Sequence, residues 1–252
     1  MNKSTLPPIL ITSSVIAMDS SVNLKNAELR VRYTLEGLGK WLAISPKISI
    51  VICDGSGYDF SKKILEHFPE ANIECLYFEN NLKSIQMYGK GFGEGEIINY
   101  AIKHSKVLKN ANWFCKCTAK LWVDNFFECI SSWNERFLCK AYFSNVFSFK
   151  KIRLEYIDTR FYLVNKDFYI KHFSLLHMNL DESKINSIED QFRDAVSHPL
   201  MRGVMFTIPP VICGMGGGSG KYYNNSLVRR VKERLRLMLV KNQSVYKNFF
   251  HQ

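Results

Sequence analysis

The chain has 252 residues, of which 46% are hydrophobic and 23% are charged, and this composition excludes a disordered or fibrous protein. A chain of this length can bury a full core without disulfides or metals, so it predicts one α/β domain, alone or with a small C-terminal appendage. The formal net charge of +11 indicates contact with something anionic, which is a nucleic acid, a phosphate-bearing substrate or an acidic membrane surface.

The cysteines and the N-terminal segment bear on where the protein works. The seven cysteines are odd in number and lie mostly in apolar runs, as free thiols do in a reducing compartment. The Cys115-Lys116-Cys117 spacing does not suit a zinc site. Residues 6–18 are fairly apolar but lack a signal-peptide cleavage site, and no run approaches the ~18 apolar residues of a membrane span. These patterns predict a cytoplasmic protein without a structural metal.

The first half of the chain alternates strand and helix patterns. A β-rich run over residues 8–16 precedes helical spacing of apolar residues over 23–41, and the continuous apolar run 48–53 is typical of a buried parallel strand. The next predicted elements are a helix over 61–68, a strand over 72–78, a helix over 95–105 and a strand over 113–123. This alternation predicts βαβ units, and therefore a Rossmann-type, mostly parallel sheet flanked by helices.

From Arg136 onward the pattern changes to β-rich pieces over residues 137–143 and 154–164. A helical stretch, a turn-rich segment over 208–220 and a basic helix follow. We therefore expect one domain over residues 1–225, with a first half of about 1–125 and a β-rich second half of about 126–225. Residues 226–252 form a basic amphipathic tail.

Polar residues follow the predicted parallel strands at the edge where such sheets bind ligands. Ser13 ends the first strand, and Asp54 ends the second and is followed by Gly-Ser-Gly. A carboxylate at this place can accept hydrogen bonds from a nucleoside base or ribose. The alternative is a turn that uses Asp and Gly only for their backbone preferences.

Two glycine-rich segments are further candidates. Residues 89–96 differ from a dinucleotide fingerprint because they do not follow the first strand, and we expect a mobile loop that folds over substrate through Gly93 and Glu94. The alternative is a flexible helix start. Residues 214–221 fail the P-loop pattern because Met215 stands where a glycine is required. Their backbone N–H groups, around Gly217 and Ser219, can still hold an anion, unless the segment is an ordinary connector.

Three polar residues, Lys116, Thr118 and Lys120, alternate along the predicted strand 113–123 and so share one face. Two lysines there could neutralise a diphosphate, since a hydrogen bond to a charged group contributes roughly 1.5–3 kcal/mol. The alternative is a solvated strand face.

Carboxylates that could act as a general base are Asp124, Asp158, Glu189 and Asp190. Asp158 lies in a β-rich run, where a charge needs a partner, and Arg160 on the same face offers one. Glu189 is equally explained by the preference of acidic residues for the first turn of a helix.

The predicted tail helix carries one apolar stripe flanked by basic residues. Its apolar members are Val228, Val231, Leu235, Met238 and Leu239, and its arginines include Arg229, Arg230, Arg234 and Arg236. Such a helix suits anionic lipid headgroups, at about 1 kcal/mol per basic residue near the surface. The alternative is a helix packed on the domain with its charges solvated.

Several of these segments together resemble bacterial GT-A-type glycosyltransferases of O-antigen, capsule and lipopolysaccharide assembly. Residues 30–38 are similar to their first helix, residues 48–56 to their apolar strand ending in Asp-x-Ser, and residues 89–100 to a Lys-Gly-x-Gly-Glu stretch before a helix. Residues 114–125 look like the strand in which relatives carry an acidic metal motif, but Lys-x-Thr-x-Lys stands there. The sequence contains no Asp-x-Asp.

The resemblance implies a hexosyltransferase that uses a nucleotide-sugar donor, expected to be UDP-linked, and a glycan or glycolipid acceptor. It implies that Ser13 and Asp54 hold the nucleoside, that Arg30 supports the site, and that Lys116 and Lys120 meet the diphosphate. Asp158 or Glu189 would be the base. Because lysines can replace the cation that neutralises a departing diphosphate, we expect transfer without a metal, at the inner face of the cytoplasmic membrane.

Two other functions fit parts of the sequence. A basic nucleic-acid-binding protein without catalytic activity would explain the charge, but the tail carries few of the aromatic residues that such surfaces use, so no nucleic acid is expected. A methyltransferase would need a glycine loop after the first strand, where Ser13 and Ser14 stand instead.

Overall fold

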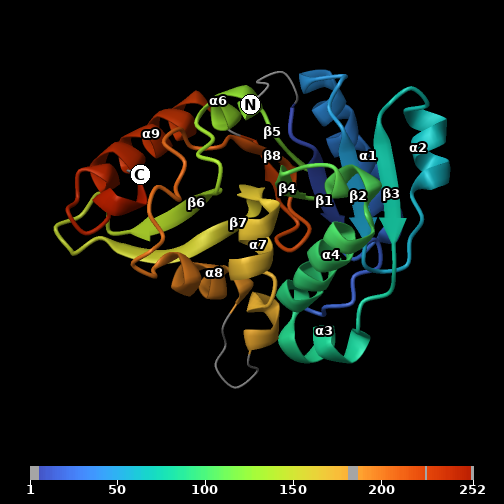
Figure 1. Ribbon diagram of the computed structural model, residues 1–252, viewed down its shortest axis with the longest axis horizontal. Coiled ribbons are helices and arrows are strands. Elements are labelled where there is room, and N and C mark those ends of the chain that lie inside the picture. The colour runs from blue at the N-terminus through green and yellow to red at the C-terminus, as the bar shows by residue number, and fades with distance from the viewer. Residues whose placement is uncertain (1–5, 181–186, 225, 251–252) are drawn as a thin grey trace.

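The computed structural model describes residues 6–180, 187–224 and 226–250; the outer limits predicted for the domain and the tail, residues 1, 225 and 252, lie outside them (Figure 1). Its main sheet has six strands, in the order β3-β2-β1-β4-β7-β6. They are β1 (Ile9–Ser13), β2 (Ile50–Asp54), β3 (Ile73–Tyr77), β4 (Trp113–Thr118), β6 (Phe137–Ser144) and β7 (Arg153–Asn165). A smaller sheet, in the order β5-β8-β9, consists of β5 (Leu121–Val123), β8 (Ile212–Met215) and β9 (Tyr222–Tyr223).

Four strands of the main sheet, β1 to β4, pair in parallel, and β7 pairs antiparallel with both β4 and β6. Only β7 therefore runs against the others. Both predicted halves contribute to this one sheet, because β4 of the first half pairs with β7 of the second. The expected α/β class with a mostly parallel sheet flanked by helices is confirmed.

Helices cover both faces of the main sheet. They are α1 (Ala27–Ile44), α2 (Ser61–His67), α3 (Leu82–Tyr88), α4 (Lys90–His104), α5 (Lys106–Lys109), α6 (Phe126–Ser131), α7 (Lys166–His172), α8 (Ile188–Val196) and α9 (Leu227–Lys241), with 3₁₀ turns η1 (Leu176–Asn179) and η3 (Lys247–Phe249). Helices α1, α2 and α6 and the small sheet pack on one face, and α4, α7 and α8 pack on the other (Figure 1). No helix in the described ranges is long and apolar enough to cross a bilayer.

The strand sequences explain this three-layer arrangement. Successive residues of a strand point to opposite faces, so Ile9 and Ile11 enter the core under α1 whereas Leu10 enters the core under α4. All five residues of β1 and of β2 are buried, as expected for central strands covered on both sides. Trp41 of α1 joins the small sheet to this core, because its indole Nε1 donates to the Leu121 carbonyl at 3.0 Å.

The predicted strand over residues 113–123 is wrong in one respect that matters for the site. Strand β4 ends at Thr118, a turn follows at Ala119 and Lys120, and β5 then belongs to the small sheet. Lys120 has a φ of 73°, in the left-handed region that a lysine rarely adopts. Lys116, Thr118 and Lys120 therefore do not share one strand face. Lys120 instead projects from a tight turn at the carboxyl end of β4.

The mobile loop expected over residues 89–96 is also wrong. These residues form the first turns of α4, and Gly91, Gly93 and Gly95 are buried there. Their lack of a side chain allows close packing: a Cβ at Gly95 would lie 2.3 Å from the His177 ring, and one at Gly93 would lie 2.8 Å from Ile85. Glu94 is thereby fixed on a helix and does not move on a loop.

Gly95→Ala should therefore destabilise the fold, because the added methyl group overlaps His177 and overpacking typically costs about 1–3 kcal/mol. The matched control is Gly39→Ala in α1, where the new Cβ would meet only Phe68, at 3.6 Å. That change should leave stability unchanged or raise it by up to about 1 kcal/mol, since alanine favours helix. Denaturant unfolding measures both, and equal effects of the two changes would contradict the close packing of α4.

Candidate active site

A cavity of about 800 Å³ opens at the carboxyl ends of β1 and β4, between α4, α8 and the β8–β9 loop. Most residues singled out in the sequence line it: Ser13, Arg30, Gly93, Glu94, Lys120, Asp158, Glu189, Gly217 and Ser219. Asp54 and Lys116 are not among the lining residues. Residues from both predicted halves therefore meet at one site.

Three cations surround the β8–β9 loop at one end of the cavity. A Cβ placed on Gly217 would lie 3.5 Å from Lys120 Nζ and 3.6 Å from Arg30 Nη1, and one on Gly218 would lie 2.7 Å from Lys90 Nζ. None of the three cations forms an ion pair with a carboxylate in the described residues. This end of the cavity therefore carries positive charge that no carboxylate of residues 6–180, 187–224 and 226–250 pairs with.

Arg30 is held in place by backbone carbonyls. Its Nε donates to the Ser14 carbonyl at 2.7 Å, and its Nη1 donates to the Leu24 carbonyl at 2.8 Å. Burial lowers the pKa of the guanidinium, although Asp54 partly opposes this, and an arginine remains charged at neutral pH. Arg30 thus contributes a fixed positive charge beside the loop.

Lys120 is 4% exposed, and no hydrogen bond of its ammonium group with a described residue is present. Burial, together with the charge of Arg30, lowers its pKa to about 7, while Asp54 opposes the shift. Because Lys120 lines the cavity and no described residue accepts a hydrogen bond from its ammonium group, an anion that enters the cavity can accept these hydrogen bonds.

The β8–β9 loop approaches these cations closely because of its glycines. Gly214 has a φ of 108°, and a Cβ there would lie 2.1 Å from the Lys120 carbonyl oxygen. The carbonyls of Gly217 and Gly218 accept from Leu24 and Asn23, at 3.2 Å each. In the described part of the chain no hydrogen bond uses the N–H groups of these two glycines, so they remain able to bind an anion.

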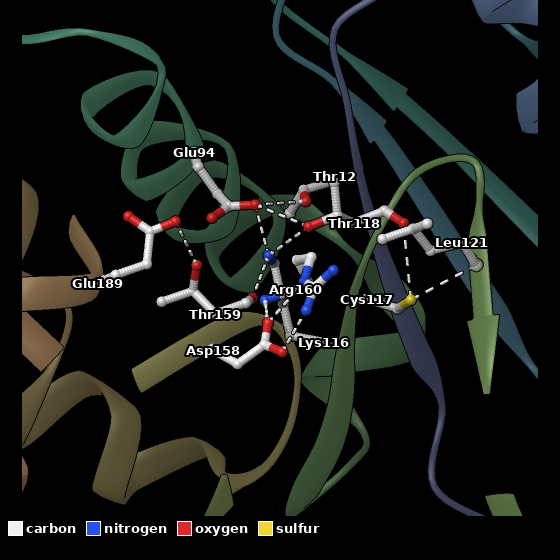
Figure 2. Close-up of polar contacts among 10 residues, drawn as sticks. All are labelled: Thr12, Glu94, Lys116, Cys117, Thr118, Leu121, Asp158, Thr159, Arg160 and Glu189. Carbon is white, nitrogen blue, oxygen red and sulfur yellow. Dashed lines mark hydrogen bonds and ion pairs between the residues drawn. The ribbon is translucent and has the colours of Figure 1, made fainter. Parts of the chain in front are cut away.

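The diphosphate role expected for Lys116 is wrong. Lys116 is fully buried, and its Nζ forms an ion pair with Glu94 and donates to the Thr159 carbonyl at 2.7 Å and to Thr118 Oγ1 at 3.0 Å (Figure 2). Glu94 also accepts from Thr12 Oγ1 at 3.1 Å. All donors of the ammonium group are used, and the pair joins α4 to β4 beneath the cavity.

The nucleoside role expected for Asp54 is also wrong, and the alternative of a structural turn is correct. The carboxylate is fully buried. It accepts from the backbone N–H groups of Val15 at 2.9 Å, Ser56 at 2.8 Å and Tyr58 at 3.2 Å, and from Ser56 Oγ at 2.6 Å. Asp54 therefore joins the ends of β1 and β2, and its oxygens are not open to a ligand.

The two base candidates, Asp158 and Glu189, differ sharply in their surroundings (Figure 2). Arg160 donates to both oxygens of Asp158, from Nε at 2.7 Å and from Nη2 at 2.6 Å. Burial raises the pKa of Asp158, but Arg160 outweighs burial and the net pKa is lowered. A carboxylate bound in this way is a poor proton acceptor.

Glu189 has no ion pair among the described residues, and its one hydrogen bond there is a long one, 3.5 Å, from Thr159 Oγ1. Burial raises the pKa of Glu189, and the nearby Glu94 carboxylate adds to this increase. A hydrogen bond from the backbone N–H of Glu189 partly offsets it. Ser187 and Asp190 form a capping box at the start of α8, so Asp190 satisfies the helix end and Glu189 is not needed there. Glu189 is thus the better-placed base.

Some residues of this site were not found from the sequence. The Tyr223 ring lies under the Arg160 guanidinium, with Cζ 4.8 Å from the ring centroid, and Lys90 reaches Gly218 from the start of α4. No spacing in the sequence signals either contact, since both join segments far apart in the chain. No cluster of three or more His, Cys, Asp or Glu side chains able to hold a metal ion occurs among the described residues.

Comparisons with known proteins give likenesses of fold. No protein-family model matches the chain, and no curated protein sequence is significantly similar to it. Among solved structures, it is similar to a glycosyltransferase involved in glycosylation of the major capsid of PBCV-1, with 14% identity, a TM-score of 0.46, and coverage of 79% of this chain and 81% of that one.

Two further solved structures resemble the chain. The inositol-1-phosphate CTP transferase from T. maritima has 13% identity, a TM-score of 0.47, and coverage of 92% and 96% of the two chains. Core-mannan synthase A from Aspergillus fumigatus has 9% identity, a TM-score of 0.47, and coverage of 100% and 87%. These are distant similarities of fold.

The cationic end of the cavity predicts pH-dependent binding of a nucleoside diphosphate. A bound diphosphate stabilises the charged form of Lys120 and raises its pKa from about 7. The affinity for the diphosphate is therefore highest below the pKa that Lys120 has in the free protein. It falls by up to about tenfold per pH unit as the pH rises toward the pKa of Lys120 in the complex. Titration calorimetry with UDP from about pH 7 to about pH 9, above the phosphate pKa near 6, measures this slope.

Lys120→Met should weaken UDP binding by about 10- to 150-fold, the equivalent of one charge-assisted hydrogen bond. Lys120→Arg is the matched control, because arginine keeps its charge across this range and should remove the pH slope while retaining affinity. The same slope in the wild type and in Lys120→Arg would show that Lys120 does not meet the anion.

Proposed function

We propose that the chain is a GT-A-like glycosyltransferase that transfers a sugar from a nucleotide-sugar donor to a glycan or lipopolysaccharide acceptor. The observation that carries the proposal is one cavity lined by two different kinds of charged group. Lys120, Arg30 and the Gly217–Gly218 backbone form a cationic end, and Glu189 is a carboxylate without an ion-pair partner in the described chain.

The chemistry of an inverting transfer fits these two kinds of group. The acceptor hydroxyl oxygen attacks the anomeric carbon of the donor sugar, and the bond from that carbon to the diphosphate oxygen breaks with its electron pair. Glu189 takes the hydroxyl proton, and Lys120 and Arg30 stabilise the charge on the departing diphosphate. Two fixed cations can supply the charge neutralisation that a divalent metal gives elsewhere, so the proposal includes metal-independent transfer.

The remaining parts of the proposal concern donor, acceptor and place of action. The donor is UDP-linked, and the acceptor belongs to bacterial cell-surface polysaccharide assembly, with the protein at the cytoplasmic side of the membrane. The sequence resemblance supports this. So does the position of the basic helix α9 next to the cavity, since Arg229 lies in α9 and also lines the cavity. A nucleotide bound at the cationic end leaves Glu189 for the acceptor.

Thermal-shift measurements with UDP, GDP, CMP and dTDP sugars, each with and without EDTA, test the donor class. A ligand at about 100 times its Kd stabilises the folded state by about 2.7 kcal/mol, which should raise the melting temperature by several degrees for a chain of this size. We expect a UDP sugar to give this shift in the presence of EDTA. A shift that EDTA abolishes would contradict metal independence, and the absence of any shift would contradict the donor assignment.

Glu189→Gln should lower turnover by roughly 10²- to 10⁴-fold and leave donor affinity unchanged, because the amide cannot accept the hydroxyl proton. In the wild type, the raised pKa of Glu189 should move the acid limb of activity above the pKa of an ordinary glutamate, near 4.3. Initial rates across pH measure both effects.

The matched control is Asp194→Asn on the same helix, whose side chain is 64% exposed and does not line the cavity. Its turnover should equal that of the wild type. Equal turnover of Glu189→Gln and the wild type would remove Glu189 as the base.

A further inference from the structure

Helix α9 presents apolar side chains to solvent. Six aliphatic residues on its outer side are between 38% and 78% exposed: Leu227, Val228, Val231, Leu235, Met238 and Leu239. The opposite side of the helix packs on the protein through Val240, which is fully buried, and through the Glu233–Lys140 ion pair at 3.3 Å. The exposed stripe is therefore not needed for docking α9 onto its own domain, and it leaves a contiguous apolar surface uncovered.

The connection between β6 and β7 extends this surface. It carries Phe147, which is 53% exposed, and the fully exposed Phe149, followed by exposed Lys150 and Lys151. Lys232 Nζ of α9 lies 5.7 Å from the centroid of the Phe147 ring, so the two segments are neighbours. Figure 1 shows α9 running along the end of the molecule that β6 and β7 form. We call the exposed stripe of α9 together with residues 147–151 the α9–hairpin surface.

Basic residues outnumber acidic ones around the α9–hairpin surface. Basic residues flank it on both segments, and the single acidic residue of α9, Glu233, is paired with Lys140 and Arg236. Two of the four arginines expected to meet a membrane are engaged within the protein, since Arg230 pairs with Asp124 at 3.0 Å and Arg236 with Glu233. Arg229 remains exposed, and Arg234 is 69% exposed with only a 3.8 Å contact to Glu128.

From these observations we propose that the α9–hairpin surface docks onto an anionic lipid bilayer, with Phe147 and Phe149 inserted among the headgroups. The exposed aromatic and aliphatic side chains can insert at the boundary between the headgroups and the acyl chains of such a membrane. The lysines and arginines around them can bind its anionic headgroups. The hairpin thus provides a second anchor beside the helix, and two anchors fix the orientation of the protein on the membrane.

Docking in this way brings the cavity close to the lipid surface, because Arg229 in the first turn of α9 also lines the cavity. If the chain is the proposed glycosyltransferase, this docking makes its acceptor a glycan carried on a membrane lipid, and this part of the inference rests on the proposed function. The docking itself requires neither donor nor acceptor.

Flotation with vesicles tests the docking. The full chain is mixed with vesicles of phosphatidylcholine alone or of phosphatidylcholine with phosphatidylglycerol, without nucleotide. We expect binding to the anionic vesicles only, and a decrease of at least about tenfold in affinity for the Phe147→Ser/Phe149→Ser variant. The control variant Leu65→Ser/Tyr77→Ser removes two apolar side chains, 70% and 49% exposed, near the opposite edge of the sheet, and should bind like the wild type.

Melting temperatures close to that of the wild type verify that both variants fold, since all four side chains are exposed. Equal binding of the two variants, or equal binding to both kinds of vesicle, would overturn the proposal. A further result would also overturn it: the wild type is a dimer in light scattering, the Phe147→Ser/Phe149→Ser variant is a monomer, and neither protein floats with vesicles. A second copy of the chain would then occupy the surface. Vesicle binding without any nucleotide-induced thermal shift would reject the proposed transferase and leave the docking intact.

Discussion

The cavity brings together positive charges with which no carboxylate in the described part of the chain forms an ion pair. Lys120 is buried at the end of β4 in a left-handed turn, and the Arg30 guanidinium lies on the other side of the same glycine loop. Holding two like charges together away from water is unfavourable, and the lowered pKa of Lys120 expresses this. The arrangement persists because β4, α1 and the small sheet are packed tightly around it, and it leaves a site prepared for an anion before any ligand arrives.

The acidic residues in and around the cavity are divided between structure and chemistry. Asp54 binds backbone N–H groups, Glu94 neutralises Lys116, and Asp158 holds Arg160. Asp54 and Glu94 each stabilise a junction between two elements, and Asp158 forms an ion pair within β7. All three carboxylates are thereby removed from proton transfer. Glu189 is the carboxylate that burial leaves with a raised pKa and no cation bound to it in the described chain. The cations around the β8–β9 loop are thus suited to a leaving anion, and Glu189 is suited to an incoming hydroxyl group.

The sequence predicts most of the fold because the central strands are continuous apolar runs and the helices have clear periodicity. It could not distinguish Lys116 from Lys120: their spacing places both on one strand face, and nothing in a Thr-Ala-Lys segment signals that the strand ends at Thr118. The glycines of residues 89–96 suggested a loop because glycine disfavours helix. In the folded protein they permit contacts with His177 and Ile188 that lie far away in the chain. The hydrogen-bond partners of Asp54 and the ion-pair partner of Glu94 are fixed by tertiary packing in the same way.

A structure of the chain with UDP bound, determined from crystals grown in EDTA, would show whether Lys120, Arg30 and the glycine loop bind the diphosphate without a metal. The account predicts that a β-phosphate oxygen lies within hydrogen-bond distance of Lys120 Nζ, next to Arg30 and the backbone of Gly217 and Gly218. A nucleotide bound away from this end of the cavity, or a diphosphate seen only when a divalent cation is restored and bridges it to a carboxylate, would contradict the account.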